Sequence, residues 1–165
     1  MTKTQKNLEE AFAGESQANR RYLGYARQAE KEGYPQVAKL FRAVAEAETV
    51  HALTHLKHLN GIKSTRENLE EAIAGETHEF KKMYPRMIQE AAEEGKNAVK
   101  RSFEFANAVE EIHAGLYQEI LDNMDNLPDT DYHVCSVCGY TVAGEPPDKC
   151  PVCNAAGKAF FRIDQ

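Results

Sequence analysis

The chain has 165 residues, with 20 Lys and Arg against 26 Asp and Glu, which gives a formal net charge of −6. This length accommodates one medium domain, or one domain and a small module. The acidic balance argues against a nucleic-acid or anionic-membrane partner, because such partners call for clustered Lys and Arg. No apolar run approaches the ~20 residues that cross a bilayer, and the polar start Met1–Lys6 is not a signal peptide, so we expect a cytoplasmic protein.

The composition changes near residue 126. The chain before this point is rich in Ala, Glu, Lys, Leu and Gln and has no Cys, whereas the remainder holds all four Cys and four of the six Pro. We therefore predict two domains, 1–126 and 131–165, joined by a linker over 123–131.

An internal duplication organises the first domain. The segment Asn7–Glu15 is repeated, with one substitution, as Asn68–Glu76. Further along, Glu48-x-x-His51 corresponds to Glu110-x-x-His113 once one inserted residue is allowed for. On a helix, residues three apart share a face, so each Glu and His pair can hold one ion. A four-helix bundle with Glu on two helices and Glu-x-x-His on the other two is a known arrangement for a carboxylate-bridged pair of metals.

The apolar periodicity predicts four long helices over 4–32, 36–60, 65–94 and 96–123. Asn60 is expected to help end the second, and a Ser64/Glu67 capping box to begin the third. The two copies are offset by 61 residues up to Glu76, but by 62 from Gly95 onward, so one residue has been inserted in the third helix. Because a proline inside a helix already removes a hydrogen bond, we predict a kink or a π-bulge around Tyr84–Pro85.

Hard carboxylate oxygens with one nitrogen per metal suit iron or manganese. The candidate ligands of the bundle are five carboxylates and two imidazoles: Glu15, Glu48, Glu76, Glu79, Glu110, His51 and His113. The simpler alternative is that these acids belong to solvated helix faces, and the matching register of both copies argues against it. His55 and His58 share a face with His51, which leaves a zinc site as a second alternative. Tyr22 and Tyr84 are candidate hydrogen-bond donors to the site, or aromatic core residues.

The second domain carries a four-cysteine motif. Cys135-x-x-Cys138 and Cys150-x-x-Cys153 are separated by eleven residues, a spacing typical of a tetrahedral sulfur site with short strands around two metal-binding knuckles. Zinc and iron both fit this spacing. Nearby aromatic residues favour iron, because they exclude water from a one-iron centre: Tyr132, Tyr140, Phe160 and Phe161.

These motifs together resemble the rubrerythrin family over the whole chain. The resemblance implies an all-α four-helix ferritin-like bundle with two iron ions, and a small β-rich rubredoxin-like domain with one Fe(Cys)4 centre. It implies reduction of hydrogen peroxide to water, with electrons from a rubredoxin or an NAD(P)H-dependent reductase. Within the family pattern, Glu79 and His51 exchange as ligands of one iron, and Tyr22 and Tyr84 lie near that centre. Asn154 departs from the usual Gly of the second knuckle.

Two other functions remain open at this point. In one, the bundle oxidises Fe(II) for storage or protection, and the tail is a structural zinc ribbon. In the other, the tail binds a partner protein.

The short connection between the second and third helices bears on assembly. Five extended residues reach only ~17 Å, whereas a crossover along the bundle would need ~40 Å. Either the helices run simply up and down, or two chains exchange helix pairs in a domain-swapped homodimer. We expect the swapped dimer, because it keeps the ligands arranged around the metals.

Overall fold

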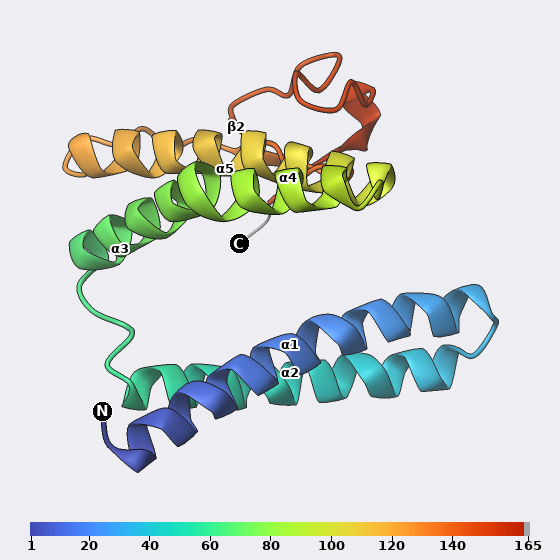
Figure 1. Ribbon diagram of the computed structural model, residues 1–165, viewed down its shortest axis with the longest axis vertical. Coiled ribbons are helices and arrows are strands. Elements are labelled where there is room, and N and C mark those ends of the chain that lie inside the picture. Colours follow the sequence, from blue (N-terminus) through green and yellow to red (C-terminus); the bar gives the residue numbers. More distant parts are fainter. Residues whose placement is uncertain (164–165) are drawn as a thin grey trace. The chain divides into compact units, whose positions relative to one another are not determined.

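The computed structural model describes residues 1–163 and divides into two compact units, one over residues 1–63 and one from residue 64 onward. The first unit contains the first two helices of the chain, and the second contains the remaining helices and a small sheet (Figure 1). The predicted domain boundary near residue 126 stays a prediction.

The first unit is a hairpin of two antiparallel helices, α1 (Lys3–Lys31) and α2 (Pro35–His58). A capping box of Thr2 and Gln5 begins α1. Gly33 turns the chain with a φ of 83°, a conformation that glycine adopts without a steric penalty. Asn60, with a φ of 54°, follows the end of α2, as the sequence predicted. The two predicted helices are therefore confirmed to within about two residues.

A seam of small side chains joins α1 and α2. Ala38, Ala45 and Ala52 are buried in α2 and lie seven residues apart, which is two helical turns, so they form one stripe. Ala26 and Ala29 of α1 are buried as well, and Phe41 packs against this cluster. Several larger apolar side chains of the hairpin are exposed to solvent: Tyr25 (50%), Val37 (45%), Leu40 (64%), Val50 (64%) and Leu53 (52%).

The third predicted helix is interrupted where the insertion was placed. Its segments are α3 (Thr65–His78), the π-helix η1 (Glu79–Met83) and α4 (Tyr84–Glu93). The N–H of Tyr84 donates to the carbonyl of Glu79, five residues earlier. Since a π-turn takes up one more residue than an α-turn, this segment absorbs the extra residue, and the predicted π-bulge is confirmed. The Ser64 and Glu67 capping box before α3 is confirmed too.

The last helix of the second unit is α5 (Asn97–Asp122), which packs against α3 and α4. Residues 123–131 contain neither helix nor strand. They lead into a three-stranded antiparallel sheet of order β2-β1-β3, formed by β1 (Tyr132–Cys135), β2 (Thr141–Ala143) and β3 (Phe160–Arg162). A short 3-10 helix, η2 (Gly157–Ala159), precedes β3.

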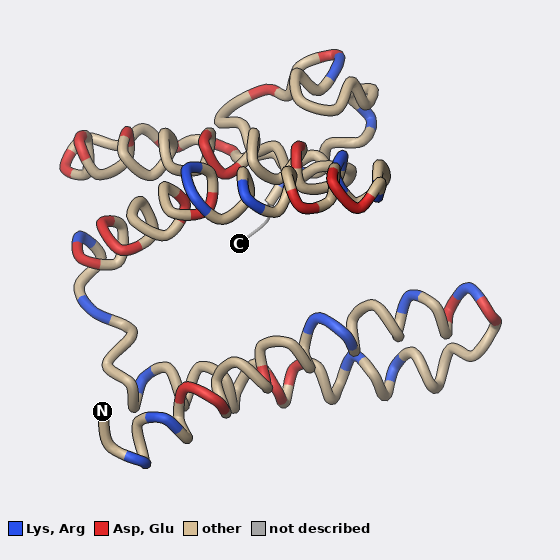
Figure 2. The backbone as a smooth tube through the Cα atoms, in the orientation of Figure 1, with Lys and Arg blue, Asp and Glu red and all other residues tan. Residues whose placement is uncertain are grey.

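Long helices with a small cysteine-bearing sheet agree with the predicted fold class. Within residues 1–163, no helix combines the length and the hydropathy that crossing a membrane requires. Acidic residues recur along the helices of both units (Figure 2).

Candidate metal centres

The first unit brings three of the predicted ligands together. Glu15 of α1 and the pair Glu48 and His51 of α2 offer ligand atoms that all lie within 4.8 Å of one another. The Nδ1 atom of His51 is 2.8 Å from Glu48 Oε2 and 3.8 Å from Glu15 Oε1. The three-residue spacing on α2 places Glu48 and His51 on one face, and the antiparallel pairing with α1 brings Glu15 opposite them.

The second unit repeats this arrangement. Glu76 of α3, with Glu110 and His113 of α5, forms a cluster of the same kind. The Nδ1 atom of His113 is 2.8 Å from Glu110 Oε2 and 3.9 Å from Glu76 Oε1. These distances match those of the first unit to about 0.1 Å, so the duplication in the sequence has become a duplication of geometry.

Each cluster presents two carboxylates and one imidazole nitrogen within reach of a single point, which suits one divalent iron or manganese ion. Burial of Glu76, together with the negative charge of Glu110, raises the pKa of Glu76 above its ordinary value. Closely spaced carboxylates repel one another, and a bound cation would relieve that repulsion. The donors therefore fit a metal, one for each half of the duplication.

Glu79 and Tyr84 stand at the two ends of the π-turn. Glu79 is the first residue of η1 and is half-buried, and Tyr84 follows the last. Burial raises the pKa of Tyr84, and the negative charges of Glu110, Glu79 and Glu76 raise it further. Tyr84 therefore keeps its phenolic proton beside a group of carboxylates, and it packs against Phe103 of α5.

The other predicted residues take different positions. Tyr22 lies in an aromatic cluster with Tyr25 and Phe41, with ring centroids 6.2 and 6.1 Å away, which agrees with the core-packing alternative. Among residues 1–163, His55 and His58 belong to none of the clusters that could hold a metal.

The four cysteines form a third cluster, in the sheet domain. Cys135 and Cys150 are buried, Cys138 and Cys153 are partly exposed, and all four are free thiols. Two pairs of Sγ atoms are 3.7 Å (Cys135 and Cys153) and 3.5 Å (Cys138 and Cys150) apart. A tetrahedral ion with bonds of ~2.3 Å would separate its sulfur ligands by ~3.7 Å. The spacing is thus that of ligands around one ion.

Two matching turns build this site. Gly139 and Asn154 each lie four residues after the first cysteine of a knuckle, with φ values of 86° and 61°. Asn is one of the few residues that tolerate this backbone conformation, so the departure at Asn154 leaves the knuckle intact. Burial raises the pKa of Cys138, so a proton must be displaced from this thiol when a metal binds.

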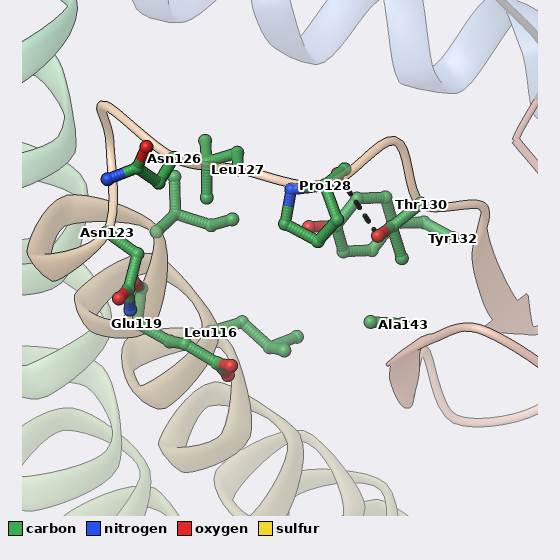
Figure 3. Close-up of a pocket in the computed structure, with 10 residues that line it drawn as sticks. Leu116, Glu119, Asn123, Asn126, Leu127, Pro128, Thr130, Tyr132 and Ala143 are labelled. Carbon is green, nitrogen blue, oxygen red and sulfur yellow. Dashed lines mark hydrogen bonds between the residues drawn. The ribbon is translucent and has the colours of Figure 1, made fainter.

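The aromatic surroundings of the cysteine cluster are only partly as predicted. The rings of Tyr140 and Phe160 meet edge to face, with centroids 6.0 Å apart. Phe161 is 50% exposed, because the alternation along β3 turns it to the other side of the sheet from Phe160. Tyr132 lines a pocket of about 260 Å³ between the end of α5 and residues 126–130 (Figure 3).

Sequence reasoning missed one residue beside the second cluster. The hydroxyl of Thr141, in β2, lies 3.0 Å from Nε2 of His113. The two residues are 28 positions apart, and no local pattern marks the threonine. Only the docking of the sheet against α5 brings them together.

Comparisons with known proteins agree with this geometry. The family model described as rubrerythrin matches residues 6–121, and the model of the rubrerythrin rubredoxin-like domain matches residues 133–161. Rubrerythrin-2 of Clostridium acetobutylicum is 34% identical, covering 93% of this chain and 92% of its own. Rubrerythrin of Porphyromonas gingivalis is 36% identical, covering 97% and 89%.

A second kind of relative is named nigerythrin. Nigerythrin of Nitratidesulfovibrio vulgaris is 34% identical, covering 91% of this chain and 81% of its own. A solved structure titled as the fully reduced, all-ferrous state of nigerythrin has a TM-score of 0.59 and 32% identity, covering 99% of this chain and 88% of that one.

Proposed function

The chain belongs to the rubrerythrin family, and from that premise we propose that it is a non-haem di-iron peroxidase that reduces hydrogen peroxide to water. The family supplies its cofactors, a di-iron site and a rubredoxin-like iron site. The observation that carries the proposal is the presence, in one chain, of two matched Glu-Glu-His clusters and one cluster of four cysteines. When bound, the iron pair supplies the two electrons that the O–O bond requires, and the cysteine-bound iron returns them singly.

In the proposed ligand set, each cluster holds one side of the iron pair. Its members are the two clusters and Glu79: Glu15, Glu48, His51, Glu76, Glu79, Glu110 and His113. Cys135, Cys138, Cys150 and Cys153 hold the third iron. Carboxylates on both sides neutralise much of the positive charge and can bridge two ions.

Glu79 is proposed to exchange with His51 during the cycle. An extra carboxylate is favoured when the charge at the site rises, and a neutral imidazole when it falls. The His51 side chain is 55% exposed, against 24% for His113, so His51 is the less confined of the two imidazoles. Glu79 begins the π-turn, beside Glu76 and Tyr84, where its negative charge helps to raise the pKa of both.

Tyr84 is proposed to donate a hydrogen bond, and then a proton, to an oxygen of the substrate. Its raised pKa keeps the phenol protonated at neutral pH, which a donor requires. Tyr22 is proposed to have a lesser role near the site, since its ring contacts are with Tyr25 and Phe41.

We also propose that two chains exchange helix pairs in a domain-swapped homodimer. Only residues 59–64 connect α2 to α3, and six extended residues reach about 20 Å. Helix α2, with 24 residues, is about 36 Å long, so this connection cannot return along a bundle. A two-helix hairpin with large exposed apolar side chains needs a second pair of helices to bury them. In the swapped dimer, that pair comes from the other chain.

The proposed electron donor is a rubredoxin or an NAD(P)H-dependent reductase that reaches the cysteine site. The proposed compartment is the cytoplasm, because a reducing environment keeps paired Cys-x-x-Cys thiols available for metal.

A rapid-mixing experiment tests the function. The protein is loaded with iron, reduced without oxygen and mixed with peroxide or with dioxygen. We expect peroxide to reoxidise the bundle iron faster than dioxygen does. A Glu110→Ala variant, which lacks one bundle carboxylate and keeps the cysteine site, is the control and should lose this reaction. Equal or faster reoxidation by dioxygen would contradict a peroxidase and favour an iron-oxidising bundle.

Metal analysis separates the zinc-ribbon alternative. Iron and zinc fit the sulfur spacing equally well. A red protein with about three iron ions per chain supports electron entry through the tail. Zinc in the tail of the protein purified from its own cells would remove that entry point.

A further inference from the structure

The two imidazoles of the duplicated clusters differ in what holds their outer nitrogen. In both, Nδ1 faces the carboxylates, at 2.8 Å from the nearer one. Nε2 of His113 meets the hydroxyl of Thr141 at 3.0 Å. Within residues 1–163, the structure shows no hydrogen bond to Nε2 of His51. The two clusters therefore match in their Nδ1 contacts, and they differ in that a residue of the tail, Thr141, contacts Nε2 of His113.

Once Nδ1 of His113 binds a metal, only one assignment of donor and acceptor is possible in this hydrogen bond. Nε2 then carries the hydrogen and must donate, so the Thr141 oxygen accepts. The Thr141 hydroxyl in turn lies 3.1 Å from the carbonyl of Gly139 and donates to it. Every group in this short chain has a partner, and the ring of His113 is fixed in angle as well as in position.

The sheet holds Thr141 firmly in place. Thr141 pairs with Val134 in the antiparallel ladder of β2 and β1, and the next residue of β1 is the metal-binding Cys135. Val109, one helical turn before His113 on α5, is only 2% exposed. A methyl group added to Gly139 would lie 3.8 Å from Val109, so the knuckle already rests against α5 there. Two residues of α5 that lie one turn apart, Val109 and His113, thus lie against Gly139 and Thr141, which follow Cys138.

We propose that Thr141 is a positioning residue, by which the rubredoxin-like domain fixes the His113 imidazole as a permanent ligand of the bundle metal. This inference rests on the proposed function and extends it. Within the described part of the chain, Nε2 of His51 has no comparable partner, whereas Nε2 of His113 is held by Thr141. The tail then has a second role besides carrying electrons, because it decides which of two equivalent histidines can move.

The contact lies in the wall of a pocket of about 280 Å³ that is partly open to solvent, and His113, Tyr117, Tyr132 and Thr141 help to line it. A freed Nε2–H would therefore exchange its hydrogen with water. This makes the hydrogen bond measurable apart from catalysis.

Three variants of the full chain test the proposal. Thr141→Val keeps the shape and removes the hydroxyl, and Thr141→Ser keeps the hydroxyl. Thr130→Val is the matched control, because the Thr130 hydroxyl also donates to a backbone carbonyl, that of Pro128 in the linker at 3.2 Å, away from any ligand (Figure 3). Each protein is loaded with zinc alone at all sites, which is diamagnetic and allows the imidazole N–H signals to be followed by NMR.

We expect the His113 Nε2–H signal to persist in the wild type, Thr141→Ser and Thr130→Val, and to be lost to solvent exchange in Thr141→Val. The N–H signal of the His51 imidazole should be the same in all four proteins. Chelator competition should show a fall of about 10–100-fold in the zinc affinity of the bundle for Thr141→Val alone.

The outcomes separate this inference from the proposed function. A wild-type bundle that takes up no metal refutes the proposed function and leaves nothing for Thr141 to position. A wild-type bundle that binds zinc, with Thr141→Val equal to it in affinity and in N–H exchange, overturns the inference alone. A Thr141→Ser variant as weak as Thr141→Val would also overturn it, because the hydroxyl would then be irrelevant. Iron-loaded samples of each variant should keep the colour of the cysteine site, which reports a folded tail.

Discussion

Inserting one alanine after Lys82 should disable the bundle site and leave the cysteine iron in place. Lys82 is exposed and lies inside the π-turn η1, so the added residue need not enter a core. The π-turn already absorbs one extra residue, and this keeps the faces of α3 and α4 aligned. A second extra residue would exceed what the turn absorbs, and the two faces would no longer be aligned as they are now.

The size of this change follows from helix geometry. One residue corresponds to a rotation of about 100° and a rise of about 1.5 Å. For a side-chain atom about 5.5 Å from the helix axis, that rotation is a displacement of about 8 Å. Metal ligands must lie within about 0.2 Å of their ideal distance. Either Glu76 and Glu79 or the face of Tyr84 must therefore leave the site.

Iron per chain and the visible spectrum give the assay. The insertion variant should retain the colour of the cysteine site and lose either the iron of the bundle or its reaction with peroxide. Lys82→Ala, which keeps the residue count, is the control and should behave as the wild type. An insertion variant that still binds all its iron and reacts with peroxide would refute the role given to the π-turn.

Four further results are expected. Cys153→Ser should abolish the red colour and turnover from an external donor, yet chemically reduced bundle iron should still consume peroxide; loss of that single turnover would argue against separate roles. Glu79→Ala should fold and take up metal but cycle more slowly, and a metal-free product would make Glu79 an ordinary structural ligand. Mixing Glu15→Ala chains with Glu110→Ala chains, with unfolding and refolding, should restore some intact sites if each site is shared between subunits, and none if it is not. In the metal-free protein, Glu76→Gln should be more stable than the wild type at neutral pH, because a raised folded-state pKa lowers stability as pH rises through it. That difference should vanish below the ordinary pKa of 4.5, and a difference that grows on acidification would contradict it.

The parts of the structure that the sequence predicted are those with a local or repeated signal. The π-turn was predictable because the two copies change offset between Glu76 and Gly95. The knuckles followed from cysteine spacing, and the capping box from Ser64 and Glu67. Each of these depends on residues within a few positions of one another, or on a comparison of the chain with itself.

The contact of Thr141 with His113 had no such signal. It depends on how the sheet docks on α5, and a single hydroxyl in a β-strand has no pattern to distinguish it from any surface threonine. The surroundings of Tyr22 were also beyond the sequence, since helical spacing allows a ring to reach either a carboxylate or its aromatic neighbours. Packing between elements decides such cases.

The alanine seam between α1 and α2 has a consequence for how the protein reaches its native state. Alanine side chains allow two helices to approach closely, but they bury little apolar area, and Leu40, Val50 and Leu53 remain outside the seam. A hairpin of this kind gains most of its stability only when it packs against a second pair of helices, because that contact buries its larger apolar side chains. The refolding rate should therefore be second order in chain concentration, with a half-time that lengthens on dilution. Newly made chains should depend on encountering one another soon after synthesis.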